Sequence, residues 1–232
     1  MAQRYLDWFF SGTARGYGKT TKMAMESLKA GTHWSQSGVA GSYGNGSAMR
    51  SSPIGVYFRN DLPTIIKVAT IDAQITHASD EAIAGSIAIA LTAAYAINND
   101  TDNLLEKIHP HLPDSKVKNT IYSLGALLDA SQISTATALA VLGTKADVRE
   151  TVPSALYLFM KYDNYQQAVL AAINAGNDTD TTAAIVGSLF GAKYGRQCIP
   201  QNWIDQVEDS EKLMVLDSQL HNRSNQLFFP RS

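Results

Sequence analysis

Cysteine is almost absent from this chain, which has 232 residues and a single residue of that type, Cys198. One thiol cannot form a disulfide within the chain, and this lack is typical of proteins in reducing compartments. An excess of charge is absent too, because 19 lysines and arginines face 21 aspartates and glutamates, for a net charge of -2. Nucleic acids and anionic membranes attract proteins that carry a basic field, so we expect neither as a partner.

Segments typical of export or membrane insertion are also missing. The sequence MAQRYLDWFF has Asp7 inside its only apolar cluster and no small-residue cleavage site, so we expect no secretory signal there. The longest apolar run, residues 82–97, is interrupted by Gly85, Ser86 and Thr92 and is shorter than the ~20 residues that a membrane span needs. Together these absences predict a cytoplasmic protein.

Alanine-rich stretches of helical length are what the sequence has in abundance, and Gly, Pro, Asn or Asp separates one from the next. Alternating β-branched runs are scarce, and the best strand candidate, residues 65–70, fits a helix equally well. We therefore predict an all-α fold. Helices are expected over residues 20–30, 80–97, 116–129, 133–142, 152–160, 165–175 and 181–193.

The organisation of the chain follows from the same pattern. Residues 82–97 are apolar on every side with only small polar interruptions, which is typical of a helix buried among others. No low-complexity linker divides the chain, so we predict a single domain over residues 1–232. The polar residues 217–232 are predicted to form a loosely attached tail.

The string NDTDTT, residues 177–182, holds more oxygen donors than one helix cap requires. Gly176 suits the left-handed end of one helix, and Thr181 is expected to begin the next. In the non-helical turn between them, the carboxylates of Asp178 and Asp180 and the Thr181 hydroxyl can converge on one point. Mg²⁺ and Mn²⁺ prefer such all-oxygen ligands, so the string predicts a metal site.

The alternative for this string is a doubly capped helix start, which the aspartates would also stabilise through the helix dipole. Taken alone, the string favours that alternative. The residues that follow favour the metal site, because small side chains recur at every fourth position and form a seam that another backbone can approach closely. This seam consists of Ala183, Gly187, Gly191 and Gly195.

A second candidate site is the glycine-rich stretch 41–55. Its first three glycines allow the backbone to turn sharply and to point N–H groups at an anion. Asn45, Ser47 and Arg50 add side-chain donors, which favours binding of a diphosphate. The alternative is an ordinary surface turn, which Gly-Asn-Gly also forms. Because the residues up to Gly55 are typical of a helix entering the core, we favour the binding role.

Two further strings are weaker. His77 precedes an expected helix whose first turn holds Asp80 and Glu81, and a single histidine in a loop is more often structural than functional. The string NNDTDN, residues 98–103, resembles the acidic string above. It follows the end of a long expected helix and lacks a small-residue seam, so we interpret it as a connecting loop.

Taken in order, five strings resemble the ADP-ribosylglycohydrolase family, which includes the dinitrogenase reductase-activating glycohydrolases and the J1 crystallins. They are GNGSAMRSSPIG, ITHAS, VPSALYLF, AGNDTDTTAAIVGSLFGAKYG and IPQNW, and the resemblance spans residues 5–215. It implies a compact orthogonal bundle of helices and a hydrolase that removes ADP-ribose from a modified side chain or small molecule. It also implies a centre of two Mg²⁺ or Mn²⁺ ions.

The resemblance also implies roles for residues of this chain. Asp178, Asp180 and Thr181 match metal ligands, and the two aspartates are the expected catalytic residues. The expected partner is an ADP-ribosylated protein or a small ADP-ribose derivative. The residues expected to bind that substrate are Gly44, Asn45, Gly46, Ser47, Met49, Arg50 and His77.

One motif of the family, a Thr-Asp-Asp cluster that precedes the equivalent of Tyr5-Leu6-Asp7-Trp8, does not occur in this sequence. We therefore expect a chain that is short at its N-terminus, exposes apolar surface, and is weak or inactive until a complementing segment supplies the missing ligands. The alternatives are a protein that binds ADP-ribose without catalysis and a structural protein of crystallin type.

Overall fold

The computed structural model describes residues 1–13 and 15–228, and over those residues the chain is helical and contains no β-strand, which confirms the all-α prediction. The α-helices are α1 (Ala2–Phe9), α2 (Lys19–Lys29), α3 (Trp34–Ser37), α4 (Ser52–Tyr57), α5 (Leu62–Thr76), α6 (Asp80–Ile97), α7 (Leu104–Ile108), α8 (Lys116–Asp129), α9 (Thr135–Leu142), α10 (Val148–Lys161), α11 (Tyr165–Ile173), α12 (Thr179–Tyr194), α13 (Gln201–Ile204) and α14 (Ser210–Phe228). Short 3₁₀ helices are η1 (Ala48–Arg50), η2 (His109–His111) and η3 (Arg196–Cys198).

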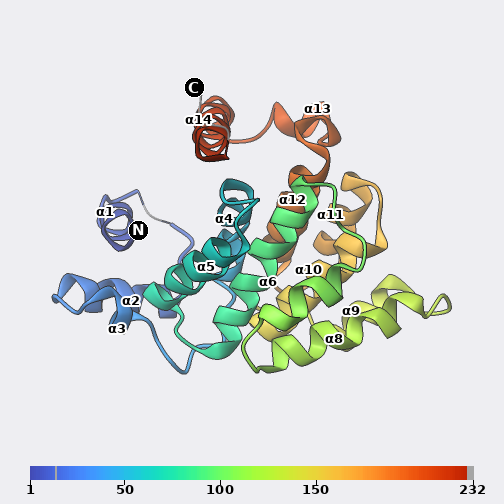
Figure 1. Cartoon of the computed structure of the whole chain (residues 1–232), viewed down its shortest axis with the longest axis horizontal. Coiled ribbons are helices and arrows are strands. Elements are labelled where there is room, and N and C mark those ends of the chain that lie inside the picture. The colour runs from blue at the N-terminus through green and yellow to red at the C-terminus, as the bar shows by residue number, and fades with distance from the viewer. Residues whose placement is uncertain (14, 229–232) are drawn as a thin grey trace.

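Helix α6 runs through the centre of the molecule (Figure 1), as the sequence predicts. Ser79 caps its first turn by accepting a hydrogen bond from the Ala82 N–H at 3.2 Å. Helices α4, α5, α10 and α12 pack around it, because its small side chains leave room on all sides. By length and composition α6 is the one described helix able to cross a membrane, and 72% of it is buried inside the structure. It forms the core of the bundle.

Two glycines allow close packing on α6. A Cβ atom on Gly55 in α4 would lie 1.8 Å from the carbonyl oxygen of Ala90, so the backbones of α4 and α6 are in direct contact. A Cβ atom on Gly85 in α6 would lie 2.4 Å from Cγ2 of Val148 in α10. Any side chain at either position would push a neighbouring helix away from the core.

The predicted small-residue seam along α12 does not have this role. Nothing lies within 4 Å of a Cβ atom built on Gly191, and the nearest atom to one on Gly187 is the Tyr165 hydroxyl oxygen, at 3.3 Å. The expectation of a close backbone approach along this seam is therefore wrong. Helix α12 instead packs on the core through larger apolar side chains, namely Ile185, Val186, Leu189 and Phe190.

The structure also settles whether residues 65–70 are helix or strand, and it corrects the predicted start of one helix. Residues 65–70 lie inside α5, so the helical alternative is confirmed for them and the strand is wrong. Helix α10 begins at Val148, before the predicted residue 152, because Asp147 caps it by accepting from the Arg149 N–H at 2.9 Å. This earlier start brings the first turn of α10 to the candidate site described below.

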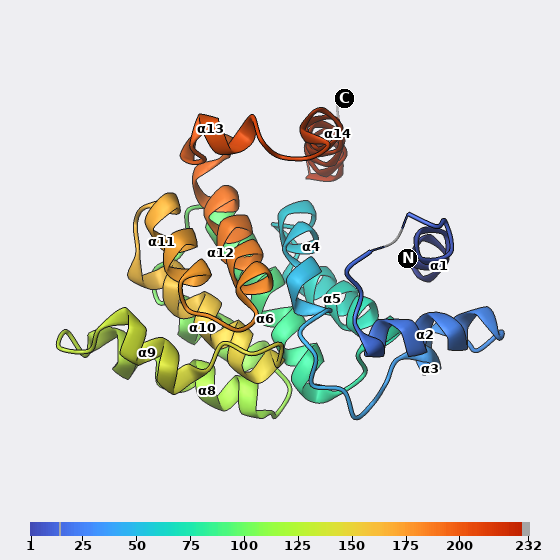
Figure 2. The same ribbon diagram turned by 180° about the vertical axis from the view of Figure 1, so that it is seen from behind.

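Helices α1 and α14 lie at the periphery, set apart from the central helices in both views (Figures 1 and 2). The residues predicted to form a tail are helical as far as Phe228, and residues 229–232 lie outside the described part. Ser224 of α14 is buried and donates to the Tyr57 carbonyl oxygen at 2.6 Å. The rest of the helix exposes large apolar side chains at Leu213, Met214, Val215, Leu216 and Leu227.

Candidate metal and nucleotide site

Three segments meet near the N-terminal end of α6: the loop 41–47, the loop 143–147 and the start of α12. Backbone hydrogen bonds join them, from Val148 N–H to the Tyr43 carbonyl at 2.8 Å and from Asp178 N–H to the Thr144 carbonyl at 2.9 Å. The Asn45 side-chain amide donates to Asp178 Oδ2 at 2.5 Å and to Thr151 Oγ1 of α10 at 2.8 Å, and the Thr151 hydroxyl donates in turn to the Lys145 carbonyl at 2.8 Å. The two candidate sites of the sequence are therefore one site.

Asp178 occupies the N-cap position of α12, and its side chain makes no capping hydrogen bond to the helix backbone. Its carboxylate accepts instead from Asn45 and, at Oδ1, from the Thr181 hydroxyl at 3.1 Å. Helix capping therefore does not explain why an aspartate occupies this position. Helix α12 begins at Thr179, so the expected non-helical turn is wrong: Asp180 and Thr181 lie in the first helical turn, where their side chains still point back toward the cap.

The electrostatics of this acidic pair are unfavourable without a cation. Burial raises the pKa of Asp178; hydrogen bonds from Asn45 and Thr181 oppose this rise, and the neighbouring Asp180 carboxylate adds to it. The Asp180 side chain is exposed, whereas Asp178 is half-buried and Thr181 is buried. Two adjacent carboxylates and a hydroxyl are oxygen donors of the kind that Mg²⁺ and Mn²⁺ select, so this ligand set fits such an ion.

The ligand set is incomplete as a cage. Nowhere in the described part of the chain do three or more His, Cys, Asp or Glu side chains gather closely enough to hold a metal ion. The acidic pair could therefore supply one side of a coordination shell at most, because Mg²⁺ needs about six ligands.

The glycines of the loop 41–47 lie over His77. A Cβ atom on Gly46 would be 2.8 Å from Cε1 of the His77 ring, and one on Gly44 would be 3.2 Å from its Nε2. Residues 45–47 form a bend and a turn, as expected, and neither glycine needs a positive φ there. The two glycines are needed because the imidazole lies directly beneath the backbone.

His77 supports this loop from the protein interior. The residue is 3% exposed, and its Nδ1 lies 2.7 Å from the Thr76 hydroxyl oxygen. Burial, assisted by the nearby Arg50 charge, lowers the pKa of His77 to about 4. The ring is therefore neutral at physiological pH. Its position favours a structural role beneath the predicted nucleotide loop.

Arg50 is engaged inside the protein. Its Nε donates to Asp72 Oδ2 at 2.8 Å. Its Nη2 donates to the Asp72 carbonyl oxygen at 2.8 Å and to the Thr76 hydroxyl oxygen at 2.9 Å. A longer bond of 3.3 Å reaches the Gly46 carbonyl. The Tyr5 hydroxyl also donates to Asp72, and the Tyr5 ring lies 4.8 Å from the guanidinium carbon. Arg50 thus fixes the loop to α5 and α1.

The remaining predicted residues differ in exposure. Ser47 is fully buried and donates to the Ala82 carbonyl at 3.3 Å, whereas Met49 is 45% exposed. Sequence reasoning missed Asp72 and Thr151, which hold Arg50 and Asn45. The signal for Asp72 was available, since it is the one acidic residue in the stretch 62–76.

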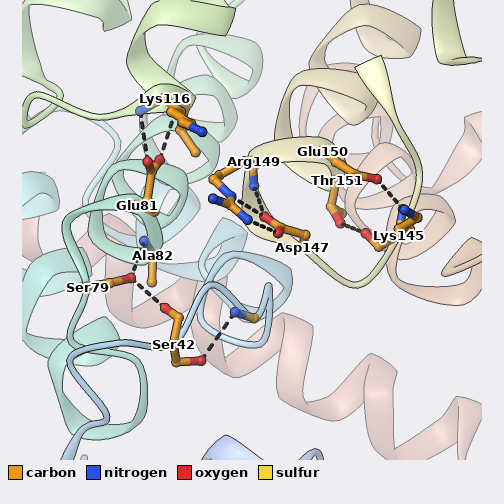
Figure 3. Close-up of polar contacts among 12 residues, drawn as sticks. Ser42, Ser79, Glu81, Ala82, Lys116, Lys145, Asp147, Arg149, Glu150 and Thr151 are labelled. Carbon is orange, nitrogen blue, oxygen red and sulfur yellow. Dashed lines mark hydrogen bonds and ion pairs between the residues drawn. The ribbon is translucent and has the colours of Figure 1, made fainter. Parts of the chain in front are cut away.

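The rim of the site is fixed by further polar contacts (Figure 3). Ser79 donates to the Ser42 carbonyl at 2.5 Å, which ties the loop 41–47 to the start of α6. Arg149 is paired with Asp147 and lies 4.1 Å from the centre of the Tyr43 ring. The N-terminal end of the loop is therefore held by protein contacts alone.

Comparison with known proteins agrees with this architecture. The sequence model of the ADP-ribosylglycohydrolase family matches residues 1–227. An uncharacterized protein of Archaeoglobus fulgidus is 30% identical over 223 residues, which are 95% of this chain and 71% of that protein. The ADP-ribosylhydrolase ARH3 of Mus musculus is 29% identical over 78% of this chain and 57% of its own length.

Two other relatives extend the comparison. The ADP-ribosylarginine hydrolase Tri1 of Serratia proteamaculans is 26% identical over 90% of this chain and 55% of its own length. A solved structure described as an ADP-ribosylglycohydrolase-related protein complex shares the fold, with a TM-score of 0.78, 24% identity, and coverage of 96% of this chain and 73% of that chain. The chain spans less than two thirds of the length of ARH3 and Tri1. From its match over residues 1–227, the chain belongs to the ADP-ribosylglycohydrolase family.

Proposed function

We propose that this chain carries the substrate loop and one half of the metal shell of a hydrolase that removes ADP-ribose from a modified side chain or small molecule. The observation that supports this most is the Asp178 carboxylate, which has no capping role, faces Asp180, and is tied by Asn45 to the loop 41–47. Relatives named as hydrolases of ADP-ribose linkages support the same reaction class.

The proposed roles follow from position. Asp178, Asp180 and Thr181 hold Mg²⁺ or Mn²⁺, and the ions, when bound, stabilise negative charge on oxygen and orient water. The loop 44–47 presents backbone N–H groups to the diphosphate of the substrate. Asn45 orients Asp178 through its hydrogen bond, so it acts as a positioning residue.

The reaction itself is the hydrolysis of a glycosidic bond. The oxygen of water bonds to the anomeric carbon of the ribose and the water releases one proton, while the bond from that carbon to the leaving nitrogen or oxygen breaks and the leaving group takes up one proton. The free products are ADP-ribose and the unmodified side chain or molecule. Asp180, which is exposed, is the carboxylate of the pair that solvent and substrate reach directly.

The test is release of ADP-ribose from an ADP-ribosylated arginine or serine substrate with excess Mg²⁺ or Mn²⁺. We expect little release by the 232-residue chain, because one loop of ligands holds two ions weakly. Fusion of a segment that bears Thr-Asp-Asp should raise the rate, and Asp180→Ala in the fused chain should abolish the gain. Equal rates for the fused chain and its Asp180→Ala variant would overturn the metal assignment.

The alternative, an ADP-ribose-binding protein without catalysis, is favoured by one observation. Arg50, His77 and Ser79 hold the loop 41–47 without help from the acidic pair. Calorimetry with ADP-ribose separates the cases: binding without release by the fused chain supports the binding protein. Absence of both binding and release supports a structural protein of crystallin type.

A further inference from the structure

Thr151 lies in the first turn of α10 and contacts two of the segments that form the candidate site. Its hydroxyl donates to the Lys145 carbonyl oxygen at 2.8 Å (Figure 3) and accepts from Nδ2 of Asn45 at 2.8 Å. Thr151 is 0% exposed and Asn45 is 7% exposed, so water competes little for either bond. Thr151 therefore joins the loop 143–147 to the Asn45 side chain inside the protein.

The chemistry of the groups fixes the direction of these hydrogen bonds. A carbonyl oxygen only accepts, so the single hydroxyl proton of Thr151 is directed to Lys145, and toward Asn45 the hydroxyl can only accept. Asn45 must therefore turn its NH₂ group to Thr151, and its second amide hydrogen is donated to Oδ2 of Asp178 at 2.5 Å. The reversed amide would place an oxygen against the carboxylate, where both groups only accept. The Thr151 hydroxyl thus favours the one amide orientation that holds Asp178.

Helix α10 also holds the backbone of Asp178, through the loop 143–147. Ser154, one turn after Thr151, donates to the Gly143 carbonyl oxygen at 2.6 Å, and the Asp178 N–H donates to the Thr144 carbonyl oxygen at 2.9 Å. The Asp178 residue is therefore fixed at its main chain by one route and at its carboxylate by the other. A ligand that is oriented before binding loses little freedom when it meets an ion, so metal affinity depends on such outer contacts.

We propose that Thr151 is a positioning residue of the metal half-site, because its hydroxyl sets the orientation of the Asn45 amide and, through that amide, of the Asp178 carboxylate. This inference rests on the proposed function, in which Asp178 holds Mg²⁺ or Mn²⁺. Thr151 acts through Asn45 in this role and contacts neither the ion nor the substrate itself.

The first test measures the orientation of Asn45 in the full chain without any metal. Thr151→Val replaces the hydroxyl with a methyl group of similar size, so the Asn45 amide loses its acceptor. Nitrogen-15 NMR relaxation of the Asn45 side-chain amide should then report larger fast motions than in the wild type. Thr151→Ser keeps the hydroxyl and should retain the wild-type order of this amide. Equal order of the amide in the wild type and in Thr151→Val would overturn the proposal.

The second test is calorimetric titration of the same variants with Mn²⁺ or Mg²⁺. Thr151→Val should weaken metal affinity about fivefold, the equivalent of one neutral hydrogen bond of about 1 kcal/mol, and Thr151→Ser should restore it. Thr92→Val is the matched control, because Thr92 is 0% exposed in α6 and its hydroxyl donates to the Ala88 carbonyl oxygen at 2.8 Å. This control should lower the melting temperature as Thr151→Val does, but it should leave metal affinity unchanged.

The outcomes separate this inference from the function on which it rests. A wild-type chain that binds neither ion would overturn the metal assignment itself. Metal binding by the wild type with the same affinity in Thr151→Val would overturn the role of Thr151 alone. Equal losses of affinity in Thr92→Val and Thr151→Val would also overturn it, because they would show a general effect of lower stability.

Discussion

The tetrapeptide Asn-Asp-Thr-Asp occurs twice, at residues 99–102 and 177–180. In both copies the asparagine adopts a left-handed conformation, with φ of 53° at Asn99 and 60° at Asn177. The first copy follows the C-terminal end of α6, and the second lies near its N-terminal end. The 18 residues of α6 separate these two ends by about 27 Å.

The two copies differ in what surrounds them. At the second copy, Asp178 faces Asp180 and is held by Asn45, and a buried network of Arg50, Asp72 and His77 lies under the neighbouring loop. At the first copy, Asp100 is exposed and pairs with Lys107, and Asp102 is exposed. The same four residues therefore form a candidate site only where buried partners position them. At that separation Asp100 and Asp102 lie too far from Asp178 for one ion to contact both copies.

The largest expected contrast is between the ion pairs at the two ends of α6. Arg50→Met removes the partner of Asp72, whose side chain is 2% exposed, and should lower the free energy of unfolding by about 3–5 kcal/mol, because a buried carboxylate is left unpaired. Lys107→Met removes the partner of Asp100, which is 55% exposed, and should cost about 0–1 kcal/mol. Urea unfolding at neutral pH measures both. Similar losses in the two variants would show that the ends of α6 do not differ in this way.

The next contrast is in pH dependence. The pKa of His77 falls from 6.5 to about 4 on folding, so between these values the unfolded state binds a proton that the folded state does not. Stability should therefore decrease as the pH falls from about 6.5 to about 4, by about 3 kcal/mol. In His77→Gln this part of the pH profile should be flat. His111→Gln, at an exposed residue beyond α7, should keep the wild-type profile.

The contact between the loop 41–47 and His77 gives a smaller effect. Gly46→Ala places a methyl group 2.8 Å from the imidazole and should cost about 1–3 kcal/mol, because a buried ring has little room to move. Gly41→Ala, where nothing lies within 4 Å, should be tolerated. Combining Gly46→Ala with His77→Ala should recover part of the loss, and strictly additive losses would contradict the proposed contact.

The last contrast concerns Mg²⁺ or Mn²⁺ and compares the two tetrapeptides directly. Asp180→Asn and Asn45→Ala should each weaken metal affinity about tenfold or more, the first by removing a ligand charge and the second by releasing Asp178. Asp102→Asn should change nothing. Calorimetric titration of the three variants and the wild type measures this. If Asp102→Asn weakens binding as much as Asp180→Asn, the site is misassigned.

Much of the architecture could be predicted from local sequence. The bounds of α6 and α8 agree with the prediction, because Ser79 and Ser115 cap helices with continuous periodicity behind them. The strand alternative for residues 65–70 was wrong. A short apolar run is compatible with both the helical and the strand periodicity, and the helix becomes evident only over the longer stretch Leu62–Thr76 with its Asp61 cap. The glycine seam of α12 failed because spacing alone does not show which face meets a neighbour.

In the candidate site, too, some features are visible in the sequence and others depend on the tertiary structure. Oxygen-rich and glycine-rich strings are visible in the amino-acid order, since capping, turn formation and metal preference are properties of the residues themselves. That Asn45 reaches Asp178, that Gly46 covers His77 and that Asp72 holds Arg50 depends on contacts between residues distant in the chain. Packing of the helices around α6 creates those contacts. Two identical tetrapeptides thus acquire different partners, because burial and proximity are properties of the folded chain.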